Sequence, residues 1–258
     1  MAREDRAPRR RAGARRDRDA ARGLPLTVRV GTSGYNYPEW KGSFYPADLP
    51  ATRMLGYYVA RFPTVEINAT FYRMPSARTV AAWAAAAPDG FAYVLKAPQR
   101  ITHVARLRDV AEPLAYFCDT ARGLGGKLGA LLFQLPPNFA KAVDRLAAVL
   151  ALLPAGLRVA FEFRHASWFD DEVYGLLGAR NAALCIADTE AGTTPTVATA
   201  DWGYLRLRAV DYTDADLARW IATMHGIGAG WRDAFVFFKH EADAPRLAAA
   251  FQARALAN

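Results

Sequence analysis

The segment LRVAFEFRH, residues 157–165, alternates between two kinds of side chain. In a β-strand, successive side chains point to opposite faces, so Val159, Phe161 and Phe163 would share one face. Ala160, Glu162 and Arg164 would share the other. Bulky apolar residues on one side and charges toward the carboxyl end of the other are typical of a barrel strand. The first side packs on helices, and the second lines the interior and the catalytic rim.

Three more segments show the same alternation. Val65 and Ile67 oppose Glu66 and Asn68; Tyr93 and Leu95 oppose Val94 and Lys96; Leu205 and Leu207 oppose Arg206 and Arg208. In each segment the polar members come late in the strand. Because the carboxyl ends of parallel barrel strands meet at one rim, we expect these polar side chains to gather there.

Eight β-rich runs can be placed along the chain: Thr27–Thr32, Thr64–Asn68, Phe91–Lys96, Gly129–Leu135, Leu157–Phe163, Ala182–Asp188, Gly203–Arg208 and Ala234–Lys239. Stretches with helical spacing lie between most of them or follow the last: Ala51–Phe62, Arg78–Ala87, Val110–Leu124, Lys141–Leu153, Asp170–Arg180, Asp214–His225 and Pro245–Leu256. This order predicts an α/β fold, a single (β/α)8 TIM barrel. A doubly wound open sheet is the alternative, but GTSGYNY (residues 31–37) does not match the G-x-G-x-x-G dinucleotide loop.

The first 23 residues differ from the rest of the chain. They hold nine arginines against four acidic residues, which is much of the net charge of +8, and they show no apolar periodicity. We therefore expect a disordered Arg-rich tail at residues 1–24 and a barrel domain at residues 25–258. An arginine arm of this kind can bind nucleic acid by counterion release, and the alternative is a solvated extension with no partner.

Composition places the protein in the cytoplasm. Apolar residues make up 52% of the chain. No run approaches the roughly 18 to 20 apolar residues that a membrane span requires, so we expect no membrane association. Cys118 and Cys185 are far apart in sequence and lack C-x-x-C spacing. Two such thiols indicate a reducing compartment and no disulfide framework, and the oligomeric state stays open.

The expected rim contains residues for both catalysis and ligand binding. The candidate catalytic residues are Glu66, Glu162, His165 and Lys96. The candidate ligand-binding residues are Ser33, Tyr35, Trp40, Asn68, Tyr72, Gln99, His103, Gln134, Arg164, Trp168, Asp188, Arg206, Arg208 and Lys239. If Glu66, Glu162 and Asp188 neutralise their share of Lys96, Arg164, Arg206 and Arg208, one positive charge is left over, with Lys239 close by. Such a surplus suits a carboxylate or a phosphate.

Each of these interpretations has an alternative. The rim charges can form a self-satisfied ion network that closes the barrel. The aromatic loops containing Trp40 and Trp168 can be a stacking wall for a sugar or base, or a hydrophobic lid. Lys96 can be a Schiff-base nucleophile or an anion partner. We expect no cofactor; a divalent metal held by Glu66, Glu162, His165 and Asp188 is the alternative, although H-E-x-x-H spacing is absent and cations surround the set.

Five motifs resemble one known family. GTSGYNYPEWKGSFYP (31–46), EINATFYRMPS (66–76), KAPQRITH (96–103), LLFQLPPNF (131–139) and EFRHASWF (162–169) follow strands one to five in this order. Together they resemble the domain of unknown function 72 (YecE-like) family across roughly Val28 to Phe251. The resemblance implies a TIM barrel and no particular reaction. For every candidate residue from Ser33 to Trp168 along the chain, the resemblance also implies a position at the rim.

The second half departs from that family's pattern. Many relatives read Arg-Leu-His-Gly in the seventh strand, where this chain has Arg206, Leu207, Arg208 and Ala209. The eighth strand ends in Lys239, His240 and Glu241 instead of paired asparagines.

The leading hypothesis is an enzyme, of hydrolase, lyase or isomerase type, that uses acid–base chemistry on a small anionic or sugar-containing metabolite. Glu162 and Glu66 would be its acid and base, and Lys96, Arg164 and Arg206 would orient the anion. One rival is a nucleic-acid-binding or phosphodiester-cleaving protein that uses the basic tail. The other is a barrel that binds a ligand without catalysis.

Overall fold

A closed ring of parallel strands forms the centre of the molecule. The computed structural model describes residues 26–240 and 242–256, so the expected tail at 1–24 lies outside the described residues. The barrel strands are β1 (Thr27–Ser33), β2 (Thr64–Ile67), β3 (Ala92–Lys96), β4 (Leu128–Gln134), β5 (Val159–Glu162), β6 (Ala183–Thr189), β8 (Trp202–Leu207) and β9 (Asp233–Phe238). Their order is β5-β4-β3-β2-β1-β9-β8-β6, and a β5–β6 pairing closes the ring. The predicted TIM barrel is confirmed.

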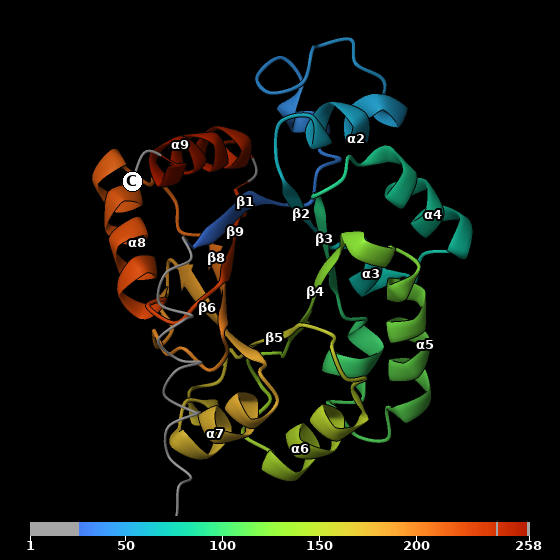
Figure 1. Cartoon of the computed structure of the whole chain (residues 1–258), viewed down its shortest axis with the longest axis vertical. Coiled ribbons are helices and arrows are strands. Elements are labelled where there is room, and N and C mark those ends of the chain that lie inside the picture. Colours follow the sequence, from blue (N-terminus) through green and yellow to red (C-terminus); the bar gives the residue numbers. More distant parts are fainter. Residues whose placement is uncertain (1–25, 241, 257–258) are drawn as a thin grey trace, which may run out of the picture.

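Helices surround the strands, as Figure 1 shows. They are α2 (Ala51–Val59), α3 (Ala69–Tyr72), α4 (Ala77–Ala86), α5 (Ala111–Arg122), α6 (Val143–Leu152), α7 (Asp171–Ala179), α8 (Asp214–Ile227) and α9 (Ala244–Leu256). Short helical turns are η2 (Pro38–Trp40), η3 (Arg100–Val104), η4 (Gly125–Lys127) and η5 (Ala166–Trp168). Between β6 and β8 the chain forms the two-residue strand β7 (Gly192–Thr193), antiparallel to β6, and then an extended segment. None of the described helices is both long and apolar enough to cross a bilayer.

The outer faces of the strands build the main core. Val65, Ile67, Phe133 and Phe161 are all buried there, and the last two stack with ring centroids 5.1 Å apart. Burying side chains of this size stabilises the fold by about 1.5–3 kcal/mol each, which is why the apolar face of every strand is directed at the helices. The alternation expected for residues 157–165 is therefore confirmed.

Helix starts follow local signals in the sequence. Thr213 forms a capping box with Asp216 at the start of α8. Asp170 accepts from the backbone N–H of Val173 at α7, and Ser76 accepts from that of Thr79 at α4. Such side chains satisfy backbone donors that the first helical turn leaves unpaired. At α4, α7 and α8 these caps fix where the preceding loop ends.

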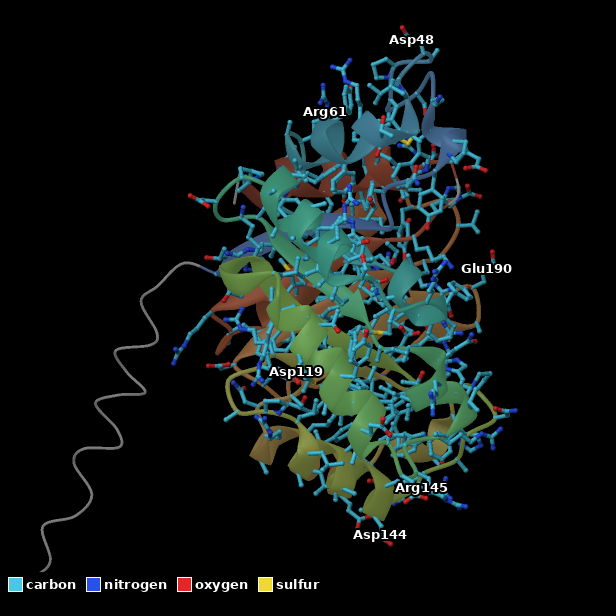
Figure 2. The ribbon with its side chains drawn as sticks, turned by 90° about the vertical axis from the view of Figure 1, so that its right-hand side faces the viewer. Asp48, Arg61, Asp119, Asp144, Arg145 and Glu190 are labelled. Atoms are coloured by element: carbon cyan, nitrogen blue, oxygen red, sulfur yellow. The ribbon has the colours of Figure 1, made fainter. Side chains whose placement is uncertain are left out.

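A second, smaller cluster fills the middle of the barrel. It includes Val94, Leu132, Cys185, Phe235 and Phe237, all with almost no exposure. This apolar layer divides the interior into two separate ends. The carboxyl-terminal end is on the right-hand side of Figure 2, where Glu190 in the turn between β6 and β7 is labelled.

Candidate functional site

Arg206 of β8 occupies the carboxyl-terminal end of the lumen between two glutamates. Its guanidinium bonds Glu66 of β2 at 2.8 Å and also pairs with Glu162 of β5. The three side chains are at most 2% exposed. Arg206 spans the barrel interior, and its planar fork lets one guanidinium bind two carboxylates.

Neutral groups complete this buried layer. The Ser33 hydroxyl donates to Glu66, and the Tyr204 hydroxyl donates to the second oxygen of Glu66 at 2.6 Å. Gln134 accepts from Arg206 at 3.5 Å. We call Ser33, Glu66, Gln134, Glu162, Tyr204 and Arg206 the lower tier. Because its carboxylates are hydrogen-bonded and paired, this tier meets the condition under which charges can be buried.

The ionisation state of the lower tier follows from these contacts. Burial alone would raise the pKa of Glu162, but the charges of Arg206 and Arg164 and their hydrogen bonds hold that pKa at about 2. Burial works against the charge of Arg206, and Glu162 and Glu66 outweigh it and keep the Arg206 pKa well above its ordinary value. Glu162 is therefore a carboxylate at neutral pH, and a general acid must carry a proton there.

A second layer of cations lies one step closer to solvent. Arg164 and Arg208 follow Glu162 and Arg206 by two residues, just beyond the ends of β5 and β8. Lys96 ends β3, and Lys239 directly follows β9. A two-residue step along a strand is about 7 Å on the same face. We call Lys96, Arg164, Arg208 and Lys239 the upper tier.

The four cations of the upper tier have few carboxylate partners. In the described part of the chain its ion pairs lead only to Glu162, from Arg164 at 3.0 Å and from Arg208 at 4.0 Å. The Nε atom of Arg208 is buried and has no hydrogen-bond partner among these residues. Its pKa is lowered by burial and by the neighbouring Arg206. Glu162 is already paired with Arg206, so the mouth of the barrel carries excess positive charge.

Lys96 and His103 form the titratable part of the mouth. Lys96 Nζ lies 4.1 Å from the centroid of the Phe71 ring, and the His103 ring meets the same ring edge-on with centroids 4.8 Å apart. Burial, Arg206 and Arg164 lower the pKa of Lys96 to about 8, against the opposing effect of the two glutamates. Burial, Lys96 and Arg164 lower the pKa of His103 as well. With a pKa of about 8, Lys96 can exchange protons near neutral pH.

A cleft of about 500 Å³ opens beside the upper tier. Glu162, Arg164 and Arg208 line one part of it, and Phe169 and the turn between β6 and β7 line another. The cleft can hold a small metabolite. A larger cleft of about 650 Å³, lined by Phe44, Phe62 and α9, is mostly apolar and shares no residue with either tier.

The loop after β1 closes one side of the lower tier. Gly34 has a φ of +87°, and a Cβ there would lie 2.5 Å from the Tyr37 hydroxyl oxygen, so the turn requires glycine. The Tyr37 hydroxyl donates to the backbone oxygen of Ser33 at 2.9 Å. Burial and the charge of Glu66 raise the pKa of Tyr37, and the neighbouring Asn68 side chain opposes this rise. Asn68 is therefore near the site.

Asp188 is not part of the rim, which corrects the sequence prediction. On β6, Ala183 and Cys185 face the lumen, so Asp188 belongs to the opposite face. It accepts from the Tyr212 hydroxyl at 2.7 Å, the Trp220 indole at 3.2 Å and the Thr193 hydroxyl at 2.7 Å. Asp188 thus anchors α8 and β7 to the outside of the barrel. Without it, the described residues place two carboxylates, Glu66 and Glu162, at the carboxyl-terminal end of the lumen, and the cationic surplus there is larger than expected.

The tryptophans expected to contact ligand are core residues. Trp40 is 1% exposed and packs with Tyr37 and Tyr45, and Trp168 is fully buried. The Trp168 indole donates to the backbone oxygen of Phe139 at 2.7 Å, and its ring stacks on Phe163. Tyr35 is half-buried against Tyr58. Of the two alternatives for these loops, the packing supports the hydrophobic lid.

Three other candidates are directed elsewhere. Tyr72 and Gln99 are exposed and line another cleft of about 440 Å³, together with Phe71 and with Pro113 and Tyr116 of α5. His165 accepts from the backbone N–H of Ser167 and caps η5. Neither Tyr72 nor Gln99 lines the cleft beside Arg164 and Arg208, and their roles in ligand binding, like that of His165 in catalysis, stay predictions.

The metal alternative loses two of its four ligands in this geometry. His165 caps η5 and Asp188 faces α8, while Glu66 and Glu162 are bound to Arg206. Within residues 26–240 and 242–256, no group of three or more His, Cys, Asp or Glu side chains is arranged to hold a metal ion. The hypothesised four-residue set is therefore not assembled.

The sequence analysis did not identify Tyr37, Cys185 or Tyr204 as residues that face the lumen. Tyr204 precedes Arg206 by two residues, so the alternation that marked Arg206 also places Tyr204 inside the barrel. Cys185 lies in the part of β6 before Asp188, which is apolar on both faces, so no alternation is visible there. Burial and the charge of Glu162 raise the pKa of the Cys185 thiol well above its ordinary value, which keeps it protonated.

Similarity to other proteins agrees with this architecture. The chain is 29% identical over 155 residues to the UPF0759 protein YunF of Bacillus subtilis (strain 168). That match covers 57% of this chain and 54% of YunF, so it spans about half of that relative.

Two solved structures of DUF72 family proteins share the fold. The one from Thermotoga maritima MSB8 is 25% identical, with a TM-score of 0.76, and the similarity covers 90% of this chain and 100% of that one. The one from Enterococcus faecalis V583 is 19% identical, with a TM-score of 0.72 and coverage of 89% and 98%. Residues 29–258 match the family described as Protein of unknown function DUF72, and the chain belongs to that family.

Proposed function

We propose that the mouth of the barrel binds a small metabolite with a carboxylate or phosphate group, and that the protein is an enzyme acting on it by proton transfer. One observation carries this proposal: the upper tier holds four cationic side chains, and its ion pairs in the described chain lead only to Glu162, which Arg206 already binds. An anion entering the cleft would gain charge-assisted hydrogen bonds without first breaking the lower tier.

The proton-transfer groups in this proposal are Lys96 and His103, in place of Glu66 and Glu162. The two glutamates are buried and held by Arg206, and the low pKa of Glu162 makes it a poor acid and a poor base. Lys96 and His103 lie at the mouth with lowered pKa values. Groups that titrate near the working pH transfer protons most effectively. The glutamates would then act by fixing Arg206 and orienting Arg164.

An anionic substrate is favoured over a neutral sugar. A sugar site needs exposed aromatic faces for stacking. Trp40 and Trp168, two of the loop aromatic residues considered for this role, are buried in the core. The cleft is lined by the charged side chains of Arg164 and Arg208, with Phe169 on another part of its wall.

The test is calorimetric titration with two probes, inorganic phosphate and pyruvate. Arg208→Gln removes a guanidinium whose Nε has no partner in the described chain. We expect at least about tenfold weaker binding, close to 1.4 kcal/mol, and an unfolding free energy within about 0.5 kcal/mol of the wild type.

Arg53→Gln on α2 is the matched control, because Arg53 is exposed and has no ion pair among the described residues. It should bind both probes like the wild type. Unchanged affinity in an Arg164→Gln/Arg208→Gln double variant, or no binding of either probe to the wild type, would refute the proposal.

A further inference from the structure

The amine of Lys96 differs from those of Lys127 and Lys141. Lys127 donates to the backbone oxygens of Ala84 and Ala87, and Lys141 pairs with Asp170 and Glu172. Lys96 is half-buried, and in the described part of the chain its amine has no ion pair and no hydrogen bond. The amine lies over the face of the Phe71 ring.

Burial and two neighbouring arginines favour the neutral amine of Lys96. Burial removes water from the ammonium form, and Arg206 and Arg164 repel its charge. The face of the Phe71 ring, Glu66 and Glu162 favour the ammonium form, but Arg206 already binds both glutamates. A desolvated lysine next to other cations is the arrangement that makes an amine nucleophilic toward carbonyl carbon.

The remaining requirements are an anchor for the substrate and a group that moves protons. Arg164 and Arg208 can hold an anionic group in the cleft. His103 shares the Phe71 ring with Lys96 and feels the charges of Lys96 and Arg164, so it lies on the same side of the mouth. Its lowered pKa leaves the imidazole neutral at neutral pH, able to accept a proton and return it.

From this geometry we propose that Lys96 forms an imine with a small aldehyde or ketone that bears a carboxylate or a phosphate. This inference rests on the proposed anion site and names its substrate class. The bond that forms joins Lys96 Nζ to the carbonyl carbon. The bond that breaks is the carbon–oxygen bond of the same carbonyl.

The protons balance without an added reagent. The neutral amine attacks the carbonyl carbon, and one amine proton moves through His103 to the carbonyl oxygen, which gives a carbinolamine. The second amine proton leaves with the hydroxyl group as water, and the imine remains. No oxidant or reductant takes part in this step.

The experiment traps the imine with sodium borohydride and reads the intact mass and the modified peptide. The probes are pyruvate and glyoxylate for the carboxylate arm and dihydroxyacetone phosphate for the phosphate arm, with acetone as the uncharged control. We expect the protein to gain the mass of a charged probe less one oxygen atom, on the peptide that contains Lys96. Which arm labels identifies the anionic group.

Two variants make the assignment specific. Lys96→Arg keeps the positive charge and cannot form an imine, so its labelling should fall to the level without borohydride. Lys41→Arg alters an exposed lysine and should label like the wild type. Circular dichroism of both variants establishes that they are folded.

The binding and labelling experiments together distinguish a failure of the imine proposal from a failure of the proposed anion site. If phosphate or pyruvate binds and loses affinity in Arg208→Gln, but no probe labels Lys96, the imine is wrong and the anion site stands. If neither binding nor labelling occurs, both are wrong. Labelling of Lys96→Arg as strong as that of the wild type, or equal labelling by acetone, also overturns the inference.

Discussion

The two ends of the barrel interior carry ion clusters of opposite composition. At the carboxyl-terminal end one arginine, Arg206, lies between Glu66 and Glu162. At the amino-terminal end one acid, Asp233, lies between Arg29 at 2.5 Å and Arg158 at 2.6 Å. The apolar layer of Phe235, Phe237 and their neighbours separates the two.

The two clusters also differ in how far they are exposed to solvent. The Asp233 side chain is 17% exposed, and the side chains of Arg29 and Arg158 are more exposed than that. Asp233 is the first residue of β9, so this cluster lies at the start of the strands, next to solvent. The lower tier is buried, and it is followed toward solvent by more cations. One end is thus a partly hydrated plug that stabilises the barrel. At the other end the buried lower tier lies beneath the upper tier, which carries excess positive charge. This difference agrees with the division of barrels into a stability face and a functional face.

The largest expected effect is that of breaking the buried cluster. Arg206→Met leaves two buried carboxylates facing each other without their cation. Removing one partner of a buried ion network costs about 3–5 kcal/mol, and we expect a loss of unfolding free energy of that size in urea denaturation. A loss below about 1 kcal/mol would show that the lower tier is hydrated and not the buried cluster described above.

The second prediction concerns pH. The pKa of Glu162 is about 2 in the folded protein and 4.5 ordinarily, so its stabilising effect is complete above about pH 4.5 and is lost as pH falls toward 2. Between about pH 6 and pH 3 the wild type should lose about 2 kcal/mol that Glu162→Gln does not lose. Parallel denaturation curves measure this difference, and equal losses in the two proteins would contradict the assigned pKa.

The smallest effect is expected at the other end. Asp233→Asn should cost about 1 kcal/mol, because partly exposed ion pairs contribute little. Salt should reduce that cost, since charges near solvent are screened, whereas the cost of Arg206→Met should change little between about 0.05 M and 1 M salt. If salt affects both variants equally, the two clusters do not differ in burial in solution.

The lower tier was largely predictable from alternation within strands. Glu66, Glu162 and Arg206 each lie opposite large apolar neighbours, and the preference of apolar side chains for the helix layer directs the polar ones inward. The same rule, extended by two residues, gives Arg164 and Arg208. Tyr204 could have been found in this way, because it shares the face of Arg206.

Asp188 and the two tryptophans could not be placed in this way. The β6 run ALCIADT is apolar on both faces before Asp188, so its sequence does not reveal which face is inside. Trp40 and Trp168 follow strands in loops, where no periodicity constrains direction. An aromatic loop residue has the same sequence pattern whether it stacks on a ligand or on Phe163.

By itself, then, the sequence determined the barrel, its strand faces and the presence of charges at one rim. These follow from local alternation and from the free energy of burying apolar surface, which act within a few residues. Only the tertiary structure decided which charges pair. Arg206 meets Glu66 and Glu162 across 140 and 44 residues of chain, and Lys96 is left without a carboxylate partner in the described chain. Pairing depends on distances across the closed barrel, and these are set by the packing of all the strands together.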